Sequence, residues 1–468
     1  MPLANNAPPR VRTRPAAPTP ATSPRAETAA VPPPKYLRLP IDSIKPAERT
    51  VRKHPKAQLA KLVANITRFQ YVADLLLDGQ HRLIDGHLLW EALKELGHTT
   101  VRCRVIDHLS AAEIDTLRIA QHALMEMSEW DDEGLKVALD GLFRIDPLLI
   151  EFTSLPMAKV DVLMLSGFKT ELDGEAIGLP PKSTQLRLGD SFVPSDQERT
   201  PVHRLVCGNA KDPAVIARAL GGQAVRMLFA DFPYGLVPIK GVVSSRHENF
   251  ADGAGLSDDA SLDFFNDVLA PSVPHIVSGG SSFLFIDHRG MFALTQATRD
   301  QGLTHVCTAV FDKQAGGMGG LYRHQVEFVL VLAKGDRIAV NNVKLGKYGR
   351  NRTTLWSSPG MAQFGPDRDA ALEAHPTVKP VQVCAEAILD VTNIGDVVLD
   401  PCMGSGTTIV AANRVNRIGV GVEIDPIFFE VAVRRLQAVT GAPMIHEETG
   451  LTLDALIAQR AAQAVLQA

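Results

Sequence analysis

The feature that most constrains the fold is a short unit near the carboxyl end of the chain. A Val-Val-Leu strand ends in Asp400, a loop with two glycines follows over 401–408, and an apolar, helix-like stretch over 409–412 comes next. A second apolar strand, 418–422, then ends in Glu423. Strand, glycine loop, helix and acid-ended strand are the layout of nucleotide-type binding in a doubly wound sheet. We therefore predict an α/β fold with a ligand site at this loop.

Two better-known glycine loops do not fit these residues. A P-loop has a lysine directly after its last glycine, and no lysine follows Gly406. A dinucleotide fingerprint has a third glycine three residues after its second, where this chain has Ile409. A purely structural turn is the remaining alternative. In the ligand-binding interpretation, the glycines allow the backbone to approach a ligand closely, and Glu423 accepts hydrogen bonds from both hydroxyls of a ribose.

A second acid-ended strand lies about 170 residues earlier in the chain. The apolar residues 227–230 lead into Asp231, and Phe-Pro-Tyr-Gly follows over 232–235. A proline biases the residue before it towards an extended backbone, here Phe232. A strand-end turn without a function is the alternative interpretation. The sequence thus places two acid-ended strands in one predicted domain.

Together these motifs resemble those of the DNA amino-methyltransferases. The segment Asp-Pro-Cys-Met-Gly-Ser-Gly-Thr-Thr (400–408) is similar to their S-adenosylmethionine loop, and Asp-Phe-Pro-Tyr (231–234) is similar to their Asp-Pro-Pro-Tyr motif. The beta-type members also carry the acid-aromatic motif before the glycine loop. The resemblance covers about 200–438 and implies a Rossmann-like methyltransferase domain with a mixed, mostly parallel sheet.

The resemblance implies S-adenosylmethionine as the cofactor. The block His-Pro-Thr-Val-Lys-Pro (375–380) is similar to the family segment beside the methionine end of that molecule. The residues expected to bind it are Asp400, Pro401, Gly404, Ser405, Gly406, Thr407, Glu423, Thr377 and Lys379.

The implied reaction transfers a methyl group to an exocyclic base nitrogen. The lone pair of such a nitrogen is delocalised into the ring, so two acceptors must hold its hydrogens before it attacks. We expect these to be the Asp231 carboxylate and the Phe232 main-chain carbonyl, with Pro233 shaping the turn and Tyr234 stacking on a base flipped from the duplex. Phe232 stands where the family has proline, but a main-chain carbonyl is present in either residue. An acid instead of serine at the first position favours adenine N6.

Basic residues cluster between the two motifs. They are Lys344, Lys347, Arg350 and Arg352. A solvated surface is the alternative, but the family places target recognition in this inserted region, which implies DNA phosphate contacts here. Because the formal net charge is −4, affinity for DNA has to come from such a local surface.

A second folded domain is expected in front. Residues 75–86 predict two short strands around an Asp-Gly turn. Asp85 is the expected cap of the helix that follows, and 101–106 predicts a third strand. This order resembles the ParB-like domain of partition proteins and phage-type DNA modification enzymes, although Leu-Leu-Trp stands at 88–90 where that family usually has an arginine.

The predicted organisation has six parts. They are a disordered leader rich in proline and alanine (1–34), a small α+β ParB-like domain (35–110), a helical extension that packs against it (111–172), a linker (173–198), the methyltransferase domain (199–440) and a helical tail (441–468).

Composition limits location and partners. Apolar runs are strand-length, well short of the roughly 18 residues of a membrane span, and the five cysteines have neither metal-site spacing nor disulfide density. We expect a cytoplasmic protein with no metal and no membrane contact, and double-stranded DNA as its partner; a homodimer is left open. The expected function is a site-specific DNA methyltransferase of the restriction-modification type, acting on adenine N6. The alternatives are an N4-cytosine enzyme and a catalytically weakened ParB-like DNA-binding protein, which Phe232 keeps open.

Overall fold

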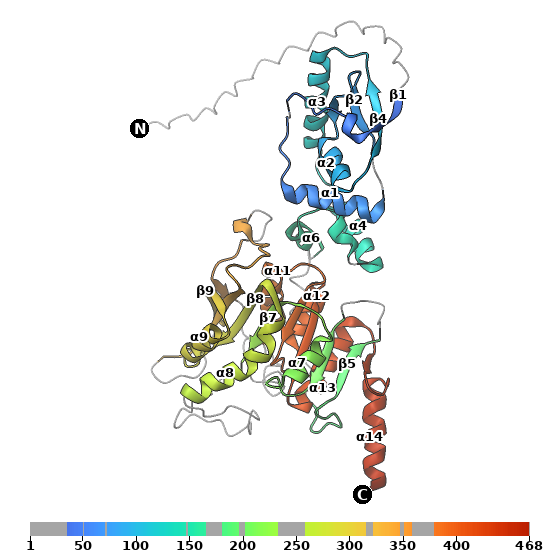
Figure 1. The fold of residues 1–468 in the computed structure, drawn as a ribbon. Coiled ribbons are helices and arrows are strands. Elements are labelled where there is room, and N and C mark those ends of the chain that lie inside the picture. Colours follow the sequence, from blue (N-terminus) through green and yellow to red (C-terminus); the bar gives the residue numbers. More distant parts are fainter. Residues whose placement is uncertain are drawn as a thin grey trace, which may run out of the picture. The chain divides into compact units, whose positions relative to one another are not determined.

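The structure is a computed structural model of the 468-residue chain. It describes residues 35–49, 51–70, 73–146, 148–164, 180–195, 202–232, 258–314, 322–346, 351–357 and 379–467. The chain divides into two compact units, Met1–Glu129 and Trp130–Ala468, which Figure 1 shows in colours that follow the sequence.

The first unit is a small α+β fold. Among its described residues, four strands form a sheet in the order β1-β4-β2-β3, in which β2 and β4 are parallel and the other pairs antiparallel. Its elements are β1 (Lys35–Pro40), α1 (Lys56–Phe69), β2 (Leu75–Asp78), β3 (Leu83–Asp85), α2 (His87–Glu95), β4 (Thr100–Ile106) and α3 (Ala111–Glu126). Aliphatic side chains from the sheet, α1 and α2 form the core.

The hairpin predicted over 75–86 is present, since β2 and β3 pair antiparallel. The predicted cap was wrong. Helix α2 has Gly86 as its N-cap residue, at a φ of 94°, and Asp85 Oδ1 accepts a hydrogen bond from the Gly86 N–H. A Cβ at residue 86 would lie 2.8 Å from a Leu75 methyl group, so this turn requires glycine. Trp90 has a structural role: its indole N–H donates to the Ile41 carbonyl at 3.2 Å.

The predicted helical extension divides between the two units. Helix α3 stays with the first, where buried Arg118 donates to the carbonyls of Leu83 and Ile84. The other helices of the predicted extension belong to the second unit; they are α4 (Asp132–Ile145), α5 (Leu149–Phe152) and α6 (Met157–Met164). Asp161 of α6 forms a two-pronged ion pair with Arg417, at 2.7 and 3.0 Å, and both side chains are buried. The expectation that the whole extension packs on the first unit is therefore corrected.

The second unit is built on a large mixed sheet. Ten strands of the described residues have the order β11-β9-β10-β8-β7-β12-β13-β6-β5-β14. The central strands β8, β7, β12, β13 and β6 are parallel, whereas most pairs nearer the edges are antiparallel. The strands are β5 (Ser191–Pro194), β6 (Arg204–Cys207), β7 (Val225–Asp231), β8 (Ile276–Ile286), β9 (Leu303–Asp312), β10 (Val326–Lys334), β11 (Leu355–Ser357), β12 (Val397–Asp400), β13 (Ile418–Glu423) and β14 (Met444–His446). The predicted doubly wound sheet is confirmed.

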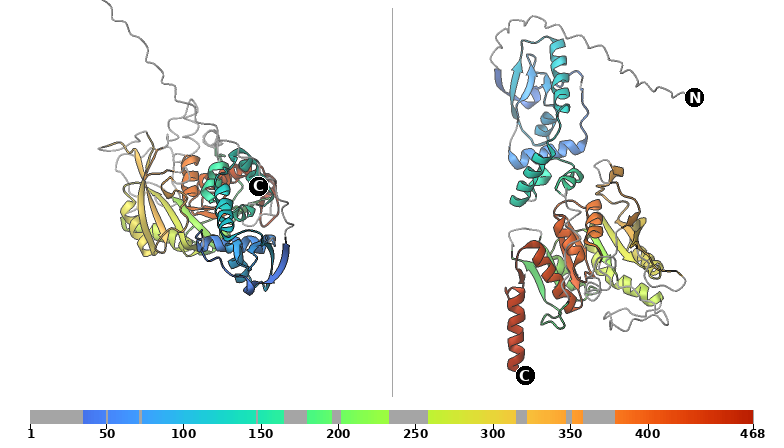
Figure 2. Two further views of the ribbon diagram at one scale, coloured as in Figure 1. Left: turned by 90° about the horizontal axis from the view of Figure 1, so that it is seen from above. Right: turned by 180° about the vertical axis from the view of Figure 1, so that it is seen from behind.

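Helices cover both faces of this sheet (Figures 1 and 2). On one face lie α7 (Pro213–Leu220), α8 (Asp258–Ser272) and α9 (Met291–Asp300); on the other lie α11 (Val381–Val391), α12 (Thr407–Arg414) and α13 (Pro426–Thr440). Side chains alternate along a strand, so Ala230 and Phe232 point to the first face and Phe229 to the second. Burial on both faces explains why these strands are apolar throughout.

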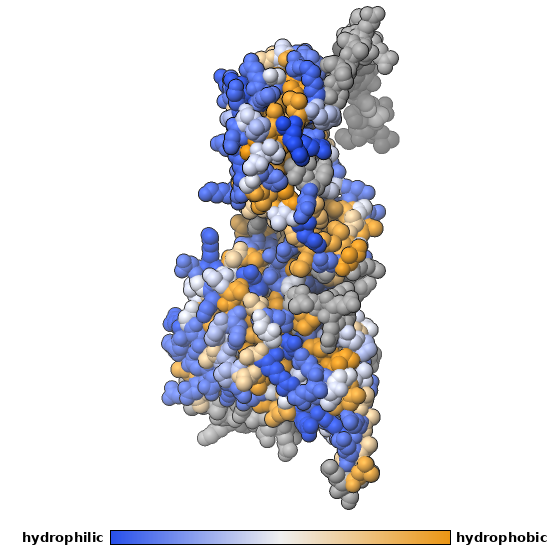
Figure 3. Space-filling view, turned by 45° about the vertical axis from the view of Figure 1, so that its right-hand side comes forward, coloured by the Kyte–Doolittle hydropathy of each residue, from blue (hydrophilic) through white to orange (hydrophobic). Residues whose placement is uncertain are grey.

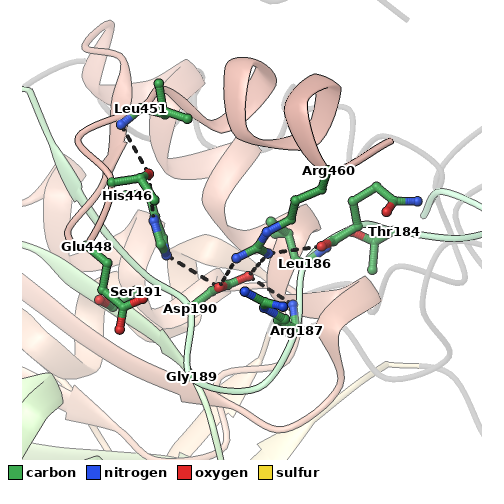
Figure 4. A network of polar contacts seen from close by, with 12 residues as sticks. Thr184, Leu186, Arg187, Gly189, Asp190, Ser191, His446, Glu448, Leu451 and Arg460 are labelled. Carbon is green, nitrogen blue, oxygen red and sulfur yellow. Dashed lines mark hydrogen bonds and ion pairs between the residues drawn. The ribbon is translucent and has the colours of Figure 1, made fainter. Parts of the chain in front are cut away.

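Two predicted boundaries are also corrected. Strand β5 lies in the predicted linker 173–198, and β14 lies in the predicted helical tail 441–468, where they pair antiparallel at one edge of the sheet. Strands of three or four residues are too short to give a periodic signal. Figure 4 shows how the tail is held: His446 Nε2 lies 3.3 Å from Asp190 Oδ1, and Arg460 of α14 (Leu453–Gln467) donates to both Asp190 oxygens at 2.6 and 2.8 Å.

The surface is mixed in character. Hydrophilic residues (blue) and apolar residues (orange) are interspersed over the face shown in Figure 3. In the part of the chain that the structure describes, no helix is long and apolar enough to cross a membrane.

Candidate active site

Three carboxylates meet at one edge of the central sheet. Strands β7, β12 and β13 are parallel neighbours, and they end in Asp231, Asp400 and Glu423, respectively. The carboxyl ends of parallel strands open at the same edge, which is where ligands bind in such sheets. The two motifs that lie about 170 residues apart in the sequence are therefore side by side in the fold.

The glycine loop folds back onto the acid of the neighbouring strand. Gly404 has a φ of 54° and donates its N–H to Glu423 Oε2 at 2.8 Å. Gly406, the N-cap residue of α12, has a φ of 82°, and a Cβ there would lie 2.9 Å from the Cβ of Ala432 on α13. Gly406 is thus required both by its backbone conformation and by the close approach of two helices.

A buried arginine supports the same loop and was missed by the sequence analysis. Arg435 of α13 donates from Nη1 to the Ser405 carbonyl at 2.8 Å, and the same nitrogen lies 3.2 and 3.1 Å from the hydroxyls of Ser405 and Thr407. It is 5% exposed. The sequence did carry a signal for this role, which is a charged residue within a largely apolar helix. A buried charge needs polar partners, so such an arginine is expected to contact polar groups of the fold.

Burial sets the charge state of the two acids beside the loop. It raises the pKa of Asp400 to about 7, against the opposing effect of hydrogen bonds from the Thr408 side chain and the Cys402 N–H. Burial also raises the pKa of Glu423 to about 7, although the N–H groups of Asp425 and of the loop bond to its carboxylate. Burial penalises the charged form of a carboxyl group, so these acids favour a ligand that brings positive charge.

Asp231 has a cationic partner instead. Lys379 Nζ lies 2.6 Å from Asp231 Oδ2 and 3.1 Å from Glu327 Oε2, and Lys313 Nζ lies 3.3 Å from Glu327 Oε1. Burial disfavours the Lys379 ammonium, but the two carboxylates outweigh that effect and raise the pKa of Lys379. The structure thus places this lysine, which the sequence assigned to cofactor binding, on the acid expected to be catalytic.

The Phe232 ring is an anchor of the core. It is fully buried and contacts two rings of α8 edge-on, with centroid separations of 5.1 Å to Phe265 and 6.5 Å to Phe264. It belongs to the face of the sheet opposite to that of Phe229. Residue 232 therefore contributes packing as well as a main-chain carbonyl.

One family model matches the part of the chain that contains this edge of the sheet. The family model described as DNA methylase matches residues 225–434, a segment that includes all three acid-ended strands. This segment of the chain is similar to the DNA methylase family.

The methylase segment also has curated relatives. Over 239 residues the chain is 23% identical to type II methyltransferase M2.MboI of Moraxella bovis, a match that covers 48% of this chain and 85% of that protein. Over 100 residues it is 34% identical to type II methyltransferase M.HpaI of Haemophilus parainfluenzae, covering 21% of this chain and 29% of that protein. The chain thus spans less than a third of the length of M.HpaI.

A ParB protein is among the solved structures to which the chain is similar. A truncated chromosome-partitioning protein ParB from Caulobacter crescentus matches 29% of this chain and 88% of its own, at 13% identity and a TM-score of 0.23. A likeness this distant carries no conclusion about what the first unit does.

The methylase edge has groups that fit S-adenosylmethionine. That molecule combines a positively charged sulfur and amine with a ribose that donates two hydrogen bonds. Asp400, which is buried, and Glu423, which is partly buried, provide carboxyl groups and hydrogen-bond acceptors at adjacent strand ends. Residues 401–407, among them the buried Pro401, form the backbone loop beside them, held by Glu423 from one side and Arg435 from the other.

Several predicted site residues lie outside the described residues. They are Pro233, Tyr234, Lys347, Arg350 and Thr377. Of the other two basic residues, Lys344 begins a short 3-10 helix. Arg352 pairs with Glu386 and Asp390, lies 4.9 Å from the centroid of the Trp356 ring, and is largely buried. DNA contact by this cluster stays a prediction.

Proposed function

We propose that this protein is an S-adenosylmethionine-dependent DNA methyltransferase of the restriction-modification type that methylates an exocyclic amino nitrogen of double-stranded DNA. The observation that carries the proposal is the pairing of β7 with β12, which sets Asp231 next to the glycine loop at one sheet edge. The DNA methylase match over 225–434 supports it independently. This reaction needs a nucleotide-like ligand and a polarising carboxylate at the same edge of the sheet.

In this proposal the loop and its acids hold the cofactor. Glu423 accepts hydrogen bonds from the ribose, while Asp400 and the N–H groups of the loop face the rest of the molecule. When bound, S-adenosylmethionine supplies a methyl group whose C–S bond breaks as the new N–C bond forms, leaving a neutral thioether. Pro401, Ser405, Thr407 and Thr377 remain proposed contacts.

Asp231 and the Phe232 carbonyl hold the two hydrogens of the target amino group. Each hydrogen bond shifts electron density onto nitrogen, so that its lone pair becomes available to the methyl carbon. The nitrogen gains a positive charge as the bond forms and then loses one proton, for which the Asp231 carboxylate is the nearest acceptor in this proposal. Catalysis of this kind depends on positioning and electrostatics. Tyr234 is proposed to stack on the flipped base, and Pro233 to shape the turn.

Adenine N6 is the proposed target, because an acid stands first in the Asp-Phe-Pro-Tyr motif. The second candidate is a DNA-binding protein with weakened catalysis, favoured by Phe232 in place of proline. The basic cluster at 344–352, a cytoplasmic location and a DNA-related role for the first unit belong to the same proposal.

The deciding experiment incubates unmethylated genomic DNA with the full chain and S-adenosylmethionine, digests the DNA and measures methylated nucleosides by mass spectrometry. N6-methyladenine is the expected product; N4-methylcytosine would reassign the target base. The Asp231→Ala variant is the negative control, and Asp454→Ala, an exposed acid on α14, is the matched control that stays active. A wild-type protein that binds DNA and the cofactor but leaves both bases unmodified would favour the second candidate.

A further inference from the structure

Four alternating charges cross the strands beside the proposed catalytic acid. Lys313 directly follows β9, Glu327 lies on β10, and Asp231 ends β7, while Lys379 enters from the residue before Pro380, the N-cap of α11. The contacts run Lys313 to Glu327 at 3.3 Å, Glu327 to Lys379 at 3.1 Å and Lys379 to Asp231 at 2.6 Å. Since the sheet order is β9-β10-β8-β7, the lysine from α11 bridges acids on two strands that have β8 between them.

Strand register explains why one lysine can reach both acids. Asp231 pairs with Phe285 on β8, and Phe285 pairs with Val329 on β10, two residues from Glu327. Residues two apart on a strand share a face, so Asp231, Phe285 and Glu327 lie on the same face of the sheet. Lys379 Nζ lies 5.3 Å from the centroid of the Phe285 ring, between the two carboxylates.

We propose that Glu327 is a positioning residue for methyl transfer, which holds the Lys379 ammonium between two carboxylates so that Lys379 does not occupy Asp231 alone and Asp231 can accept the amino hydrogens. This inference rests on the proposed function. Lys313 balances the negative charge of Glu327. The net formal charge of the four side chains is then zero, in a place where unbalanced charge is costly.

Burial makes this division of charge effective. The side chains of Lys379, Glu327 and Asp231 are 7%, 11% and 20% exposed, so solvent screens their interactions only weakly. If Lys379 paired with Asp231 alone, its ammonium group would compete with the amino hydrogens of the base for the Asp231 carboxylate. Glu327 shares the lysine, and its own pKa is lowered because Lys379 and Lys313 outweigh the effect of burial. A second anion this close therefore stays charged.

Two substitutions are expected to shift the pH dependence of methylation in opposite directions. Glu327→Gln removes a negative charge, so protonation of Asp231 becomes harder and the acid limb of kcat moves to lower pH by about one unit. The plateau kcat falls roughly tenfold or more, because Lys379 then pairs with Asp231 alone. Lys313→Met removes a positive charge, so its acid limb moves to higher pH by a smaller amount. Asp400 and the thiols of Cys384 and Cys402 also interact electrostatically with Asp231, and both variants leave them unchanged.

The test compares these variants with Glu430→Gln, which neutralises a similarly buried glutamate on α13 that pairs with Arg434 at 2.8 Å. Methylated nucleosides are measured across pH, and cofactor affinity is measured by calorimetry, where Glu327→Gln should match wild type. A wild-type protein without methylation overturns the proposed function and this inference together. If wild type methylates but Glu327→Gln keeps its kcat and pH profile, the inference alone fails. It also fails if cofactor affinity falls by the same factor as kcat. Should Glu327→Gln not fold, an unshifted acid limb in Lys313→Met overturns it.

Discussion

The ends of β7 and β12 follow one sequence pattern but have opposite electrostatics. Both strands are apolar, parallel neighbours, and both end in an aspartate. Asp231 is ion-paired with a lysine at 2.6 Å. Asp400 accepts hydrogen bonds from Thr408 and a main-chain N–H, and burial raises its pKa to about 7. The comparison teaches that the pattern places a carboxylate, whereas partners brought by the fold set its charge. In the proposed function the first acid polarises a base and the second faces a cationic cofactor.

The largest effect should come from removing the acid of β7. Asp231→Ala is expected to lower kcat by roughly a thousandfold or more, because it removes an acceptor whose contacts strengthen as nitrogen attacks. Cofactor affinity should stay within about twofold, since Glu327 still pairs with Lys379. Steady-state methylation and calorimetry measure the two quantities. If Asp231→Ala kept the wild-type kcat, the different roles proposed for Asp231 and Asp400 would be wrong.

The second prediction converts one strand end into the other. Asp400 is followed by Pro401, whereas Asp231 is followed by Phe232, so Phe232→Pro makes β7 end as β12 does. From the sequence alone, we expect Phe232→Pro to preserve or raise the rate of methyl transfer if nothing packs on the phenyl ring. The structure shows that this ring is buried and packed, so the condition does not hold. We expect a loss of roughly 3 kcal/mol in the free energy of unfolding. Denaturant unfolding measures it.

Two control variants test the packing argument. Phe232→Leu keeps most of the apolar volume and should lose less, and Phe292→Ala should lose little because that ring is 84% exposed. Unchanged stability in Phe232→Pro would show that the ring does not anchor β7.

The third prediction uses the raised pKa values beside the loop. Glu423 has an ordinary pKa of 4.5 and a folded pKa of about 7. Between these values the folded protein holds a proton that the unfolded chain has released, so the contribution of this group to stability falls as pH rises to about 7. A cationic cofactor prefers the ionised form, so its affinity should rise roughly tenfold from pH 6 to pH 8.

Calorimetry at the two pH values measures that change. Glu423→Gln should bind the cofactor more weakly and with a smaller pH dependence. Equal wild-type affinity at both pH values would mean that the acids of β12 and β13 do not face the cofactor charge.

The smallest expected effect asks whether the DNA path follows the predicted basic cluster. Replacing Lys347 and Arg350 with alanine should reduce the slope of log affinity against log salt by about two, if each side chain contacts one phosphate. Arg352→Ala is the control variant, because the Arg352 side chain already forms ion pairs with Glu386 and Asp390. Arg352→Ala should lower the free energy of unfolding and leave the salt slope nearly unchanged. An unchanged slope in the double variant would place the DNA elsewhere.

Local patterns predicted much of the architecture. The hairpin at 75–86, the acid-ended strands and the glycine loop were each visible within a few consecutive residues. The short strands β5 and β14 were missed because three or four residues carry no periodicity. The helices α4 to α6 were assigned to the wrong unit, because amphipathic spacing shows that a helix buries a face without naming the surface it meets.

The sequence by itself determined where the carboxylates stand: a short apolar strand, a glycine turn and a helix are decided by neighbouring residues. Only the tertiary structure decided what surrounds them. Lys379 reaches Asp231 across 148 positions of sequence, Arg435 supports the glycine loop from another helix, and Phe232 is anchored by rings of α8. Charge state and packing depend on desolvation and on atoms within a few ångströms. Contacts between distant segments of one chain are set by the three-dimensional arrangement of the sheet and its helices.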